Sequence, residues 1–166
     1  TAREMRFPVT LLLFDIDDFK AYNDQHGHSV GDDILRQTAA LMKRCVRDHD
    51  LVARLGGDEF AVVFWEKEGP RQPRDTRPTG ASRIPQTPIQ IFERFKRLLA
   101  SPEFSILGNT GQGQLTISAA MAVYPWNAQD VQGLIDAADR ELMFNAKVSG
   151  KNCLRLVGEE PPAMPG

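Results

Sequence analysis

The sequence has little of several features that mark special classes of protein. Only 2 of its 166 residues are cysteine, Cys45 and Cys153, and their positions form neither a metal-ligand spacing nor a disulfide framework. Reduced thiols in a cytosolic domain are the expected state, although the sequence leaves a disulfide between these two residues open. No apolar run approaches the length that spans a bilayer, and no signal peptide is apparent. The net charge of -2 implies no general attraction to nucleic acid.

The rest of the composition is that of an ordinary globular protein. Hydrophobic residues make up 42% and charged residues 25%, and 166 residues can build one domain with a full core. We expect that domain at 1–160, followed by a tail at 161–166. The chain begins at Thr1 without an initiator methionine, which suggests a domain cut from a longer protein. The domain is expected in the cytoplasm, whereas the parent protein could be anchored to a membrane.

Apolar runs and helical periodicity alternate along the chain without an internal repeat. Residues 9–16 form an apolar run that ends in acids, as expected of a central strand covered on both faces. In chain order the patterns then predict helices at 18–27 and 29–48, short strands at 51–55 and 59–65, a helix that begins near Pro88, a strand at 115–125, a long helix from 128 to 150, and a closing strand at 151–157. The hairpin predicts antiparallel pairing, in an α+β fold whose sheet is flanked by helices.

A stretch rich in proline and arginine interrupts this pattern at 66–88. It holds five of the eleven prolines. Proline removes a backbone donor and disfavours helix in the preceding residue, so an irregular loop is expected. One interpretation makes the stretch a partner-binding segment that exposes Arg71, Arg74, Arg77 and Arg83. The other, which we prefer, is a tolerated surface insertion.

The stretch RLGGDEFAVVFW, residues 54–65, sets Asp58 and Glu59 at the mouth of a strand. The two acids could simply be the solvated shoulder of a glycine turn, and strand alternation would point them to opposite faces. If the hairpin lies beside the first strand, however, Asp58 comes near Asp15, and carboxylates so placed repel unless a cation neutralises them. Mg²⁺ takes one or two carboxylates with waters and substrate phosphates, and the Ile16 carbonyl could add a ligand. Two such ions would clamp the oxygens of a phosphoryl transfer.

Two further stretches suit a nucleotide. The turn DDFK, residues 17–20, offers its two acids as caps to the helix that follows. The free N–H groups and positive dipole end of that helix favour phosphate, and Lys20 adds a charge. An asparagine both donates and accepts, and a carboxylate accepts from two neighbouring donors, so Asn23 with Asp32 would suit N1 and N2 of guanine. The alternative for Asp32 is an acid in the first turn of a helix, where acids are favoured in any case.

Together, DIDDFKAYNDQHGHSVGD and RLGGDEF, with NAKVSGKN near the far end, resemble the GGDEF family of diguanylate cyclases over residues 9–157. The resemblance implies a five-stranded sheet of the nucleotidyl-cyclase and polymerase-palm type. It also implies condensation of two GTP molecules into cyclic di-GMP, with release of pyrophosphate. Two Mg²⁺ ions per site, for which Mn²⁺ can substitute, and a homodimer of facing domains that each bind one GTP are further implications. An upstream sensory or receiver domain is expected in the parent protein.

The resemblance carries roles to individual positions. Metal binding is implied for Asp15, the Ile16 carbonyl, Asp58 and Glu59, and a catalytic role for Asp58 and Glu59. Substrate binding is implied for Lys20, Asn23, Asp32, Lys147 and Lys151. The segment RDHD, residues 47–50, matches the family's RxxD motif. Product inhibition by cyclic di-GMP is therefore implied for Arg47, Asp50 and Arg54, and an ordinary helix C-terminus is the alternative.

The sequence departs from the family pattern near its end. ADRELMFNAK is one residue longer than the family's ADxALYxAK, which puts Asp139 about 100° out of helical phase with Lys147. Lys151 stands where arginine is common, and it keeps the charge without the two-pronged geometry. Met143 and Phe144 are expected in the core. The changed helix motivates one rival function, a catalytically silent module that binds GTP or cyclic di-GMP. A polymerase-like nucleotidyltransferase is a second rival, although no basic groove is evident.

Overall fold

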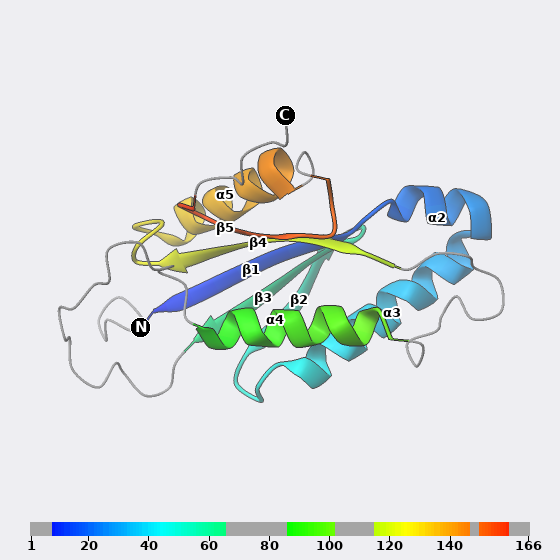
Figure 1. Ribbon diagram of the computed structural model, residues 1–166, viewed down its shortest axis with the longest axis horizontal. Coiled ribbons are helices and arrows are strands. Elements are labelled where there is room, and N and C mark those ends of the chain that lie inside the picture. Colours follow the sequence, from blue (N-terminus) through cyan, green and yellow to red (C-terminus); the bar gives the residue numbers. More distant parts are fainter. Residues whose placement is uncertain (1–7, 66–85, 102–114, 147–149, 160–166) are drawn as a thin grey trace.

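The computed structural model describes residues 8–65, 86–101, 115–146 and 150–159. Its elements form a five-stranded sheet with helices on both faces (Figure 1). In chain order they are β1 (Val9–Ile16), α2 (Phe19–His26), α3 (His28–Cys45), β2 (Leu51–Gly56), β3 (Glu59–Trp65), α4 (Gln86–Leu99), β4 (Ile117–Tyr124), α5 (Val131–Arg140), η1 (Glu141–Ala146) and β5 (Leu154–Leu156). Among the described residues, no helix combines the length and apolar character needed to cross a bilayer.

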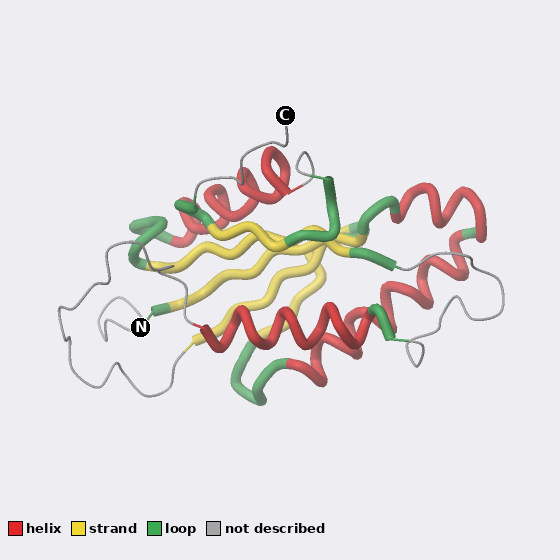
Figure 2. Tube along the Cα trace, in the orientation of Figure 1, coloured by secondary structure: helices red, strands yellow, loops and turns green. Residues whose placement is uncertain are grey.

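The order of strands in the sheet is β2-β3-β1-β4-β5, and neighbours are antiparallel except for β4 with β5. β1 therefore lies in the middle of the sheet (Figure 2), which explains why its sequence is apolar on both faces. Phe14 packs in the cluster under α3 and α4, where its ring stacks on Phe60 at 5.0 Å and contacts Phe95 at 5.4 Å. Leu13 packs in the opposite cluster, under α5 and η1. The stacked rings hold β3 beside β1 and so bring the ends of these two strands together.

Two element boundaries differ from the predicted ones. α3 ends at Cys45 instead of continuing to residue 48, because the chain turns at Arg47, whose N–H donates to Asp50 Oδ2 at 2.9 Å. α4 begins at Gln86, so residues 86–88 are helical and do not belong to an irregular loop. Pro88 is tolerated there because the first turn of a helix leaves its N–H groups without helical partners in any case. The remainder of the predicted insertion, 66–85, lies outside the described residues.

The last predicted helix needs the largest correction. α5 ends at Arg140 and continues as a π-helix, η1. The wider π turn takes up the one residue that the sequence has in excess of the family pattern. One face of α5 and η1 therefore stays buried against the sheet throughout, and it consists of Leu134, Ala138, Leu142 and Ala146. Met143 and Phe144 are 44% and 70% exposed, so the expectation that they lie in the core is wrong.

Neither cysteine forms a disulfide, in keeping with the expected reduced thiols. Cys45 lies in the core at the end of α3. Cys153 is partly buried near η1, and its Sγ contacts the Ala146 carbonyl at 3.4 Å. Burial raises the pKa of both thiols above the ordinary value, so both stay protonated at neutral pH.

Candidate active site

Two acids face each other at the end of the sheet where β1 finishes. Asp15 on β1 pairs with Glu59 on β3 in the antiparallel register. Directly opposed side chains share one face of a sheet, with Cβ atoms about 4.5–5.5 Å apart. Asp15 is 3% exposed, whereas Glu59 is exposed. Like charges in such a position destabilise a sheet unless a cation offsets their repulsion. The register therefore places Glu59, and not Asp58, directly opposite Asp15.

The two glycines between β2 and β3 position Asp58. Gly57 has a φ of 51°, in the left-handed region that glycine adopts readily, and the β2–β3 register shifts between Arg54 and Gly56. Arg54 Nε donates to the Gly57 carbonyl at 2.9 Å and holds the turn. Asp58 lies in this turn, partly buried, immediately before the first residue of β3. Strand alternation thus does not separate Asp58 from Glu59, because Asp58 is not part of the strand.

The donors at this end of the sheet fit a hard divalent cation in their chemistry. Asp15, Asp58 and Glu59 offer carboxylates, and Ile16 offers a main-chain carbonyl at the end of β1. Mg²⁺ binds oxygen ligands and commonly takes one or two carboxylates together with waters and substrate phosphates. The opposed pair supplies that number of carboxylates. Within the part of the chain that the structure describes, no three His, Cys, Asp or Glu side chains are already placed to hold a metal ion together.

Asp17 joins this end of β1 to two distant segments. Its carboxylate accepts from Thr116 Oγ1 at 2.7 Å, from Ser118 Oγ at 2.6 Å and from the Asn152 N–H at 2.9 Å. Asp17 is 8% exposed, so these three donors satisfy a largely buried charge. The expectation that Asp17 caps α2 is wrong. Its bonds instead fasten the segment before β5 to the turn before α2.

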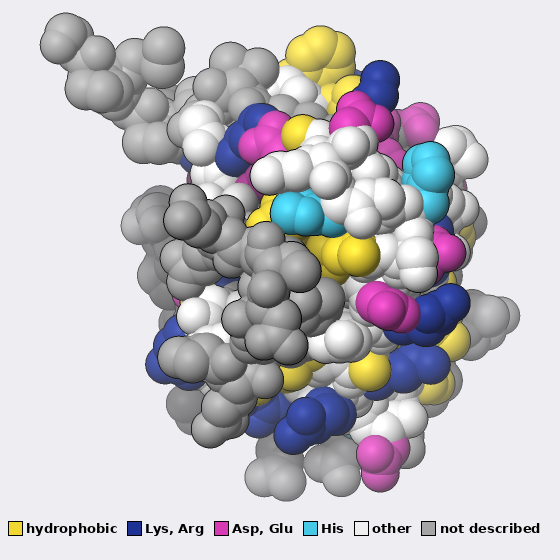
Figure 3. Space-filling model, turned by 90° about the vertical axis from the view of Figure 1, so that its right-hand side faces the viewer, with side chains coloured by type: hydrophobic (Ala, Val, Ile, Leu, Met, Phe, Trp, Pro, Cys, Tyr) yellow, Lys and Arg dark blue, Asp and Glu magenta, His cyan; other side chains and the backbone are white. Residues whose placement is uncertain are grey.

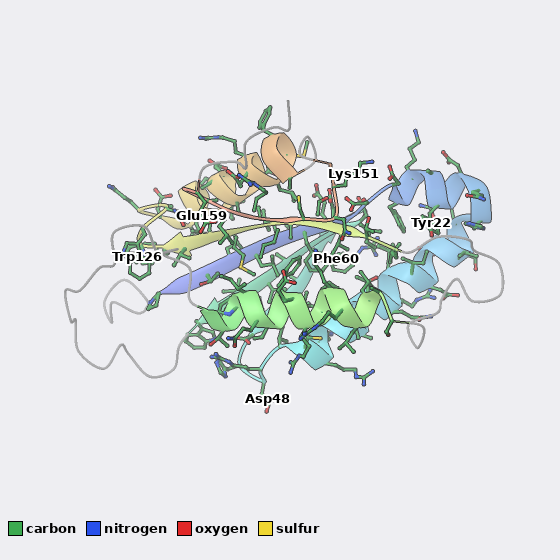
Figure 4. All side chains as sticks on the ribbon, viewed as in Figure 1. Tyr22, Asp48, Phe60, Trp126, Lys151 and Glu159 are labelled. Atoms are coloured by element: carbon green, nitrogen blue, oxygen red, sulfur yellow. The ribbon has the colours of Figure 1, made fainter. Side chains whose placement is uncertain are left out.

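Lys151 is brought to the same place by this connection. Figure 4 shows it at the end of the sheet where β1 leads into α2. Its Nζ donates to Asp18 Oδ1 at 2.5 Å. This hydrogen bond is the main cause of a raised pKa at Lys151; desolvation opposes it, and the charges of Asp18, Asp17 and Asp15 add to it. Asp18 occupies the N-cap position of α2, but its side chain does not cap the helix. Lys20 is exposed in the first turn of α2, and Lys147 lies outside the described residues.

The two residues predicted to suit guanine lie on α2 and α3. Asn23 Oδ1 is buried and has no hydrogen-bond partner within the described segments. It lies against Gly31, where an added Cβ would be 1.8 Å from it, so only glycine leaves room for this amide. Asp32 is exposed, and the first turn of α3 contains no acidic residue, which removes helix capping as the reason for Asp32. Asp32 lines a cavity of about 400 Å³ that also includes Arg36 and Arg54.

Comparison with known proteins decides the family. Residues 1–73 match the family described as "Diguanylate cyclase, GGDEF domain". A solved EAL/GGDEF domain protein from M. capsulatus is 32% identical, with a TM-score of 0.69 over 92% of this chain and 86% of that chain. The chain belongs to the GGDEF family.

Other GGDEF proteins share the sheet and helices described above. The solved GGDEF domain of TpbB from Pseudomonas aeruginosa is 28% identical, with a TM-score of 0.75 over 96% of this chain and 88% of that chain. Diguanylate cyclase A of Treponema denticola is 29% identical over 153 residues. That match includes 92% of this chain but only 36% of the Treponema protein, so this GGDEF chain spans about a third of the length of that curated relative.

In this GGDEF domain the RxxD segment forms the turn after α3. The Asp50 side chain is 0% exposed and accepts from the Arg47 N–H, so it holds the turn. Arg47 lines a cavity of about 530 Å³ between the end of α3 and α4, together with Arg94 and Arg97. Arg54, which the sequence grouped with Arg47 and Asp50, lines the separate cavity beside Asp32.

Several residues that contact the candidate sites of this GGDEF domain were not predicted from its sequence. Thr116 and Ser118 become visible as partners of Asp17 only when the β1–β4 register is known, because they lie 99 and 101 residues away in the chain. Arg94 and Arg97 follow helical spacing on α4 like any solvated face. Arg94 Nη2 donates to the main-chain carbonyl of Cys45, which is likewise 49 residues distant in the chain.

Proposed function

We propose that this GGDEF domain is a diguanylate cyclase, which joins two GTP molecules into cyclic di-GMP. The observation that carries the proposal is the opposed pair Asp15 and Glu59, at the end of the sheet where α2 begins and where Lys151 is held. Acids and a cation so arranged suit a metal-assisted reaction of a triphosphate. The name of the Treponema relative, Diguanylate cyclase A, supports the same activity.

The proposed substrate site is divided between base and phosphates. Asn23 and Asp32 would bind the guanine, since Asn23 Oδ1 needs a donor and the Asp32 carboxylate accepts from two. Lys20 and Lys151 would bind the triphosphate beside the N-terminus of α2, where backbone N–H groups favour phosphate. Lys147 is proposed as a third cation for the phosphates.

The proposed chemistry is the attack of a 3′-oxygen on an α-phosphorus. In each of two such steps a new P–O bond forms at the α-phosphorus, the bond to the β-phosphate breaks, and pyrophosphate leaves. Bound Mg²⁺, or Mn²⁺ in its place, would polarise the phosphate oxygens. Asp15, the Ile16 carbonyl, Asp58 and Glu59 are the proposed ligands. Glu59 is exposed on the face it shares with Asp15, so it can also accept the proton of the 3′-hydroxyl.

The proposal extends to assembly, to regulation and to the limits of the domain. The proposed domain spans 1–160 and is followed by a tail at 161–166. Two such domains would meet face to face, each with one GTP. A sensory or receiver domain in the parent protein would control that encounter.

The product would inhibit at the cavity lined by Arg47, with Asp50 holding the turn, because three arginines around one cavity favour a phosphodiester. Arg54, which lines the separate cavity beside Asp32, is proposed as a further contact for the product. Calorimetric titration with cyclic di-GMP, beside Arg47→Ala, tests this site.

The activity is tested by incubating the concentrated domain with GTP and Mg²⁺ and separating the products by chromatography and mass spectrometry. We expect cyclic di-GMP and pyrophosphate from the wild-type domain. Asp58→Ala should lose about 100-fold or more of the rate, because it removes a proposed ligand of the Mg²⁺ that would stabilise negative charge on the reacting phosphate. Asp24→Ala removes an exposed acid of α2 and serves as the matched control, with an unchanged rate.

A different result would redirect the assignment. GTP consumed without cyclic di-GMP would contradict the cyclase. Binding of GTP or cyclic di-GMP with no turnover at high protein concentration would favour the silent signalling module. Equal rates in the wild type and Asp58→Ala would remove Asp58 from the site.

A further inference from the structure

We infer that Asp18 lowers the affinity of this domain for its nucleotide, because its carboxylate binds Lys151 where a phosphate oxygen would otherwise bind. The inference rests on the proposed function only in taking a triphosphate as the ligand. The two residues come from opposite ends of the chain, and Lys151 Nζ donates to Asp18 Oδ1 at 2.5 Å. Figure 3 views the molecule from the α2 side and shows acidic and basic side chains lying against one another on this face.

Asp18 does not have the role that its position in the chain suggests. A residue at the N-cap usually has extended backbone and accepts from the first N–H groups of its helix. Asp18 instead has a φ of 57°, and although its main-chain carbonyl accepts from the Tyr22 N–H at 3.1 Å, its side chain accepts no hydrogen bond from α2. Its carboxylate turns to Lys151 and adds a negative charge beside the N-terminus of α2. A triphosphate that approached this terminus would meet that charge and would find Lys151 already occupied.

The backbone around Lys151 is fixed by other contacts. Lys151 and Asn152 both have left-handed backbone, with φ of 62° and 48°. The Asn152 N–H donates to Asp17, and the Asn152 carbonyl accepts from Lys96 Nζ at 3.2 Å. Removing the charge of Asp18 therefore frees the Lys151 side chain without releasing the segment that carries it. Since both side chains of the pair are solvent-exposed, at 44% for Lys151 and 64% for Asp18, a nucleotide can reach and separate them.

The consequence is a penalty on nucleotide binding. Each bound triphosphate must exchange the Asp18 carboxylate for one of its own oxygens at Lys151. The cost of breaking the pair is subtracted from the affinity. Exposed ion pairs are weak, so the penalty is small, about two- to five-fold in the dissociation constant.

Asp18→Asn tests the inference, because asparagine tolerates left-handed backbone and keeps the shape of the side chain. The probe is a GTP analogue with a methylene bridge between the α- and β-phosphorus atoms, which is titrated into the protein in the presence of Mg²⁺. We expect Asp18→Asn to bind it about two- to five-fold more tightly than the wild type, with a smaller gain in high salt. Asp24→Asn makes the same change of charge on α2, and we expect no change there. In a Lys151→Ala background the gain from Asp18→Asn should shrink, as a double-mutant cycle would show.

Equal or weaker binding by Asp18→Asn would overturn the inference, and so would an equal gain in the Asp24→Asn control. Measuring cyclic di-GMP formation in the same preparations separates the two proposals. If the wild type makes product and Asp18→Asn binds no more tightly, the inference falls and the cyclase stands. If Asp18→Asn binds more tightly but neither protein turns over GTP, the inference stands and the cyclase falls. An analogue that binds none of the variants would overturn the inference together with the nucleotide site.

Discussion

Asp17 and Asp18 are adjacent acids with opposite surroundings. Asp17 is largely buried and its two oxygens accept from three donors, whereas Asp18 is exposed and binds a single flexible cation. A buried carboxylate with several donors is costly to alter, because each donor loses its partner when the acceptor is removed. An exposed ion pair contributes little to stability. The first acid therefore belongs to the fold, and the second is free to affect the ligand.

Substitution of Asp17 should show this difference in stability. Asp17→Ala leaves two hydroxyls and one N–H without their acceptor, and we expect a loss of about 2–4 kcal/mol in the free energy of unfolding. Asp17→Asn should cost about 1–2 kcal/mol, because the amide keeps one oxygen and a hydroxyl can reverse its hydrogen bond to accept from the amide nitrogen. Chemical denaturation measures both, with Asp24→Asn as the control, expected within about 0.5 kcal/mol of the wild type. Equal stability of Asp17→Ala and Asp24→Asn would contradict the role of Asp17.

The difference between Asp15 and Asp17 also shows what the sequence can predict about the site. Asp15 was singled out from two short-range patterns, an apolar strand that ends in acids and a glycine turn followed by Asp58 and Glu59, although the sequence paired Asp15 with Asp58 and the register sets it opposite Glu59. Asn23 and Asp32 were predicted to bind guanine because their side chains have donors and acceptors that suit it, and this role stays a prediction. Asp17 was assigned to a helix cap, since its true partners are about a hundred residues away on β4. The Asp18–Lys151 pair joins positions 133 residues apart, and no local pattern indicates it.

The same limit separates the elements that were predicted from those that were not. β1, β2 and β3 were predicted within a residue, because apolar alternation and a glycine turn are local signals. α3 was extended too far, because helix propensity continues through Arg47, whereas the turn that ends the helix depends on the bond from the Arg47 N–H to an Asp50 side chain that is buried only in the fold. The π-helix η1 was missed for a similar reason. Its residues favour helix of any kind, and the burial of Leu142 and Ala146 against β4 decides the wider turn.

The π-helix makes a testable difference between two deletions. Removing Phe144, which is 70% exposed in η1, should change the free energy of unfolding by less than about 1 kcal/mol. The shortened segment can close as α-helix, with Leu142 and Ala146 three residues apart and still on one face. Removing Asp136, which is exposed in α5, should cost about 2–5 kcal/mol, because α5 is already α-helical and has no wide turn to close, so the deletion rotates the following buried residues about 100° relative to Leu134. Denaturant titration of both variants measures the difference, and equal large losses would show that η1 does not absorb an extra residue.

The fold as a unit places its chemistry at one end of the sheet. Two apolar clusters cover the two faces of the sheet, one under α3 and α4 and one under α5 and η1. Asp15, Glu59, Lys151 and the N-terminus of α2 are left together where β1 finishes. One chain carries one pair of residues suited to guanine, Asn23 and Asp32. Cyclic di-GMP contains two identical halves, so a two-fold dimer of this domain matches the symmetry of the proposed product.

If two chains must meet, activity should depend on protein concentration in a characteristic way. We expect the rate per molecule to fall when the isolated domain is diluted, because the fraction of dimer falls by mass action. A second mixture separates dimer formation from simple loss of protein. At a concentration where the wild-type rate per molecule is constant, a tenfold excess of Asp58→Ala should lower the rate per wild-type chain by about tenfold, since most wild-type chains then pair with an inactive partner. The same mass of serum albumin should leave the rate unchanged. Product formation resolved by chromatography gives both results. If the excess of Asp58→Ala protein leaves the rate per wild-type chain unchanged, a single chain performs the whole reaction.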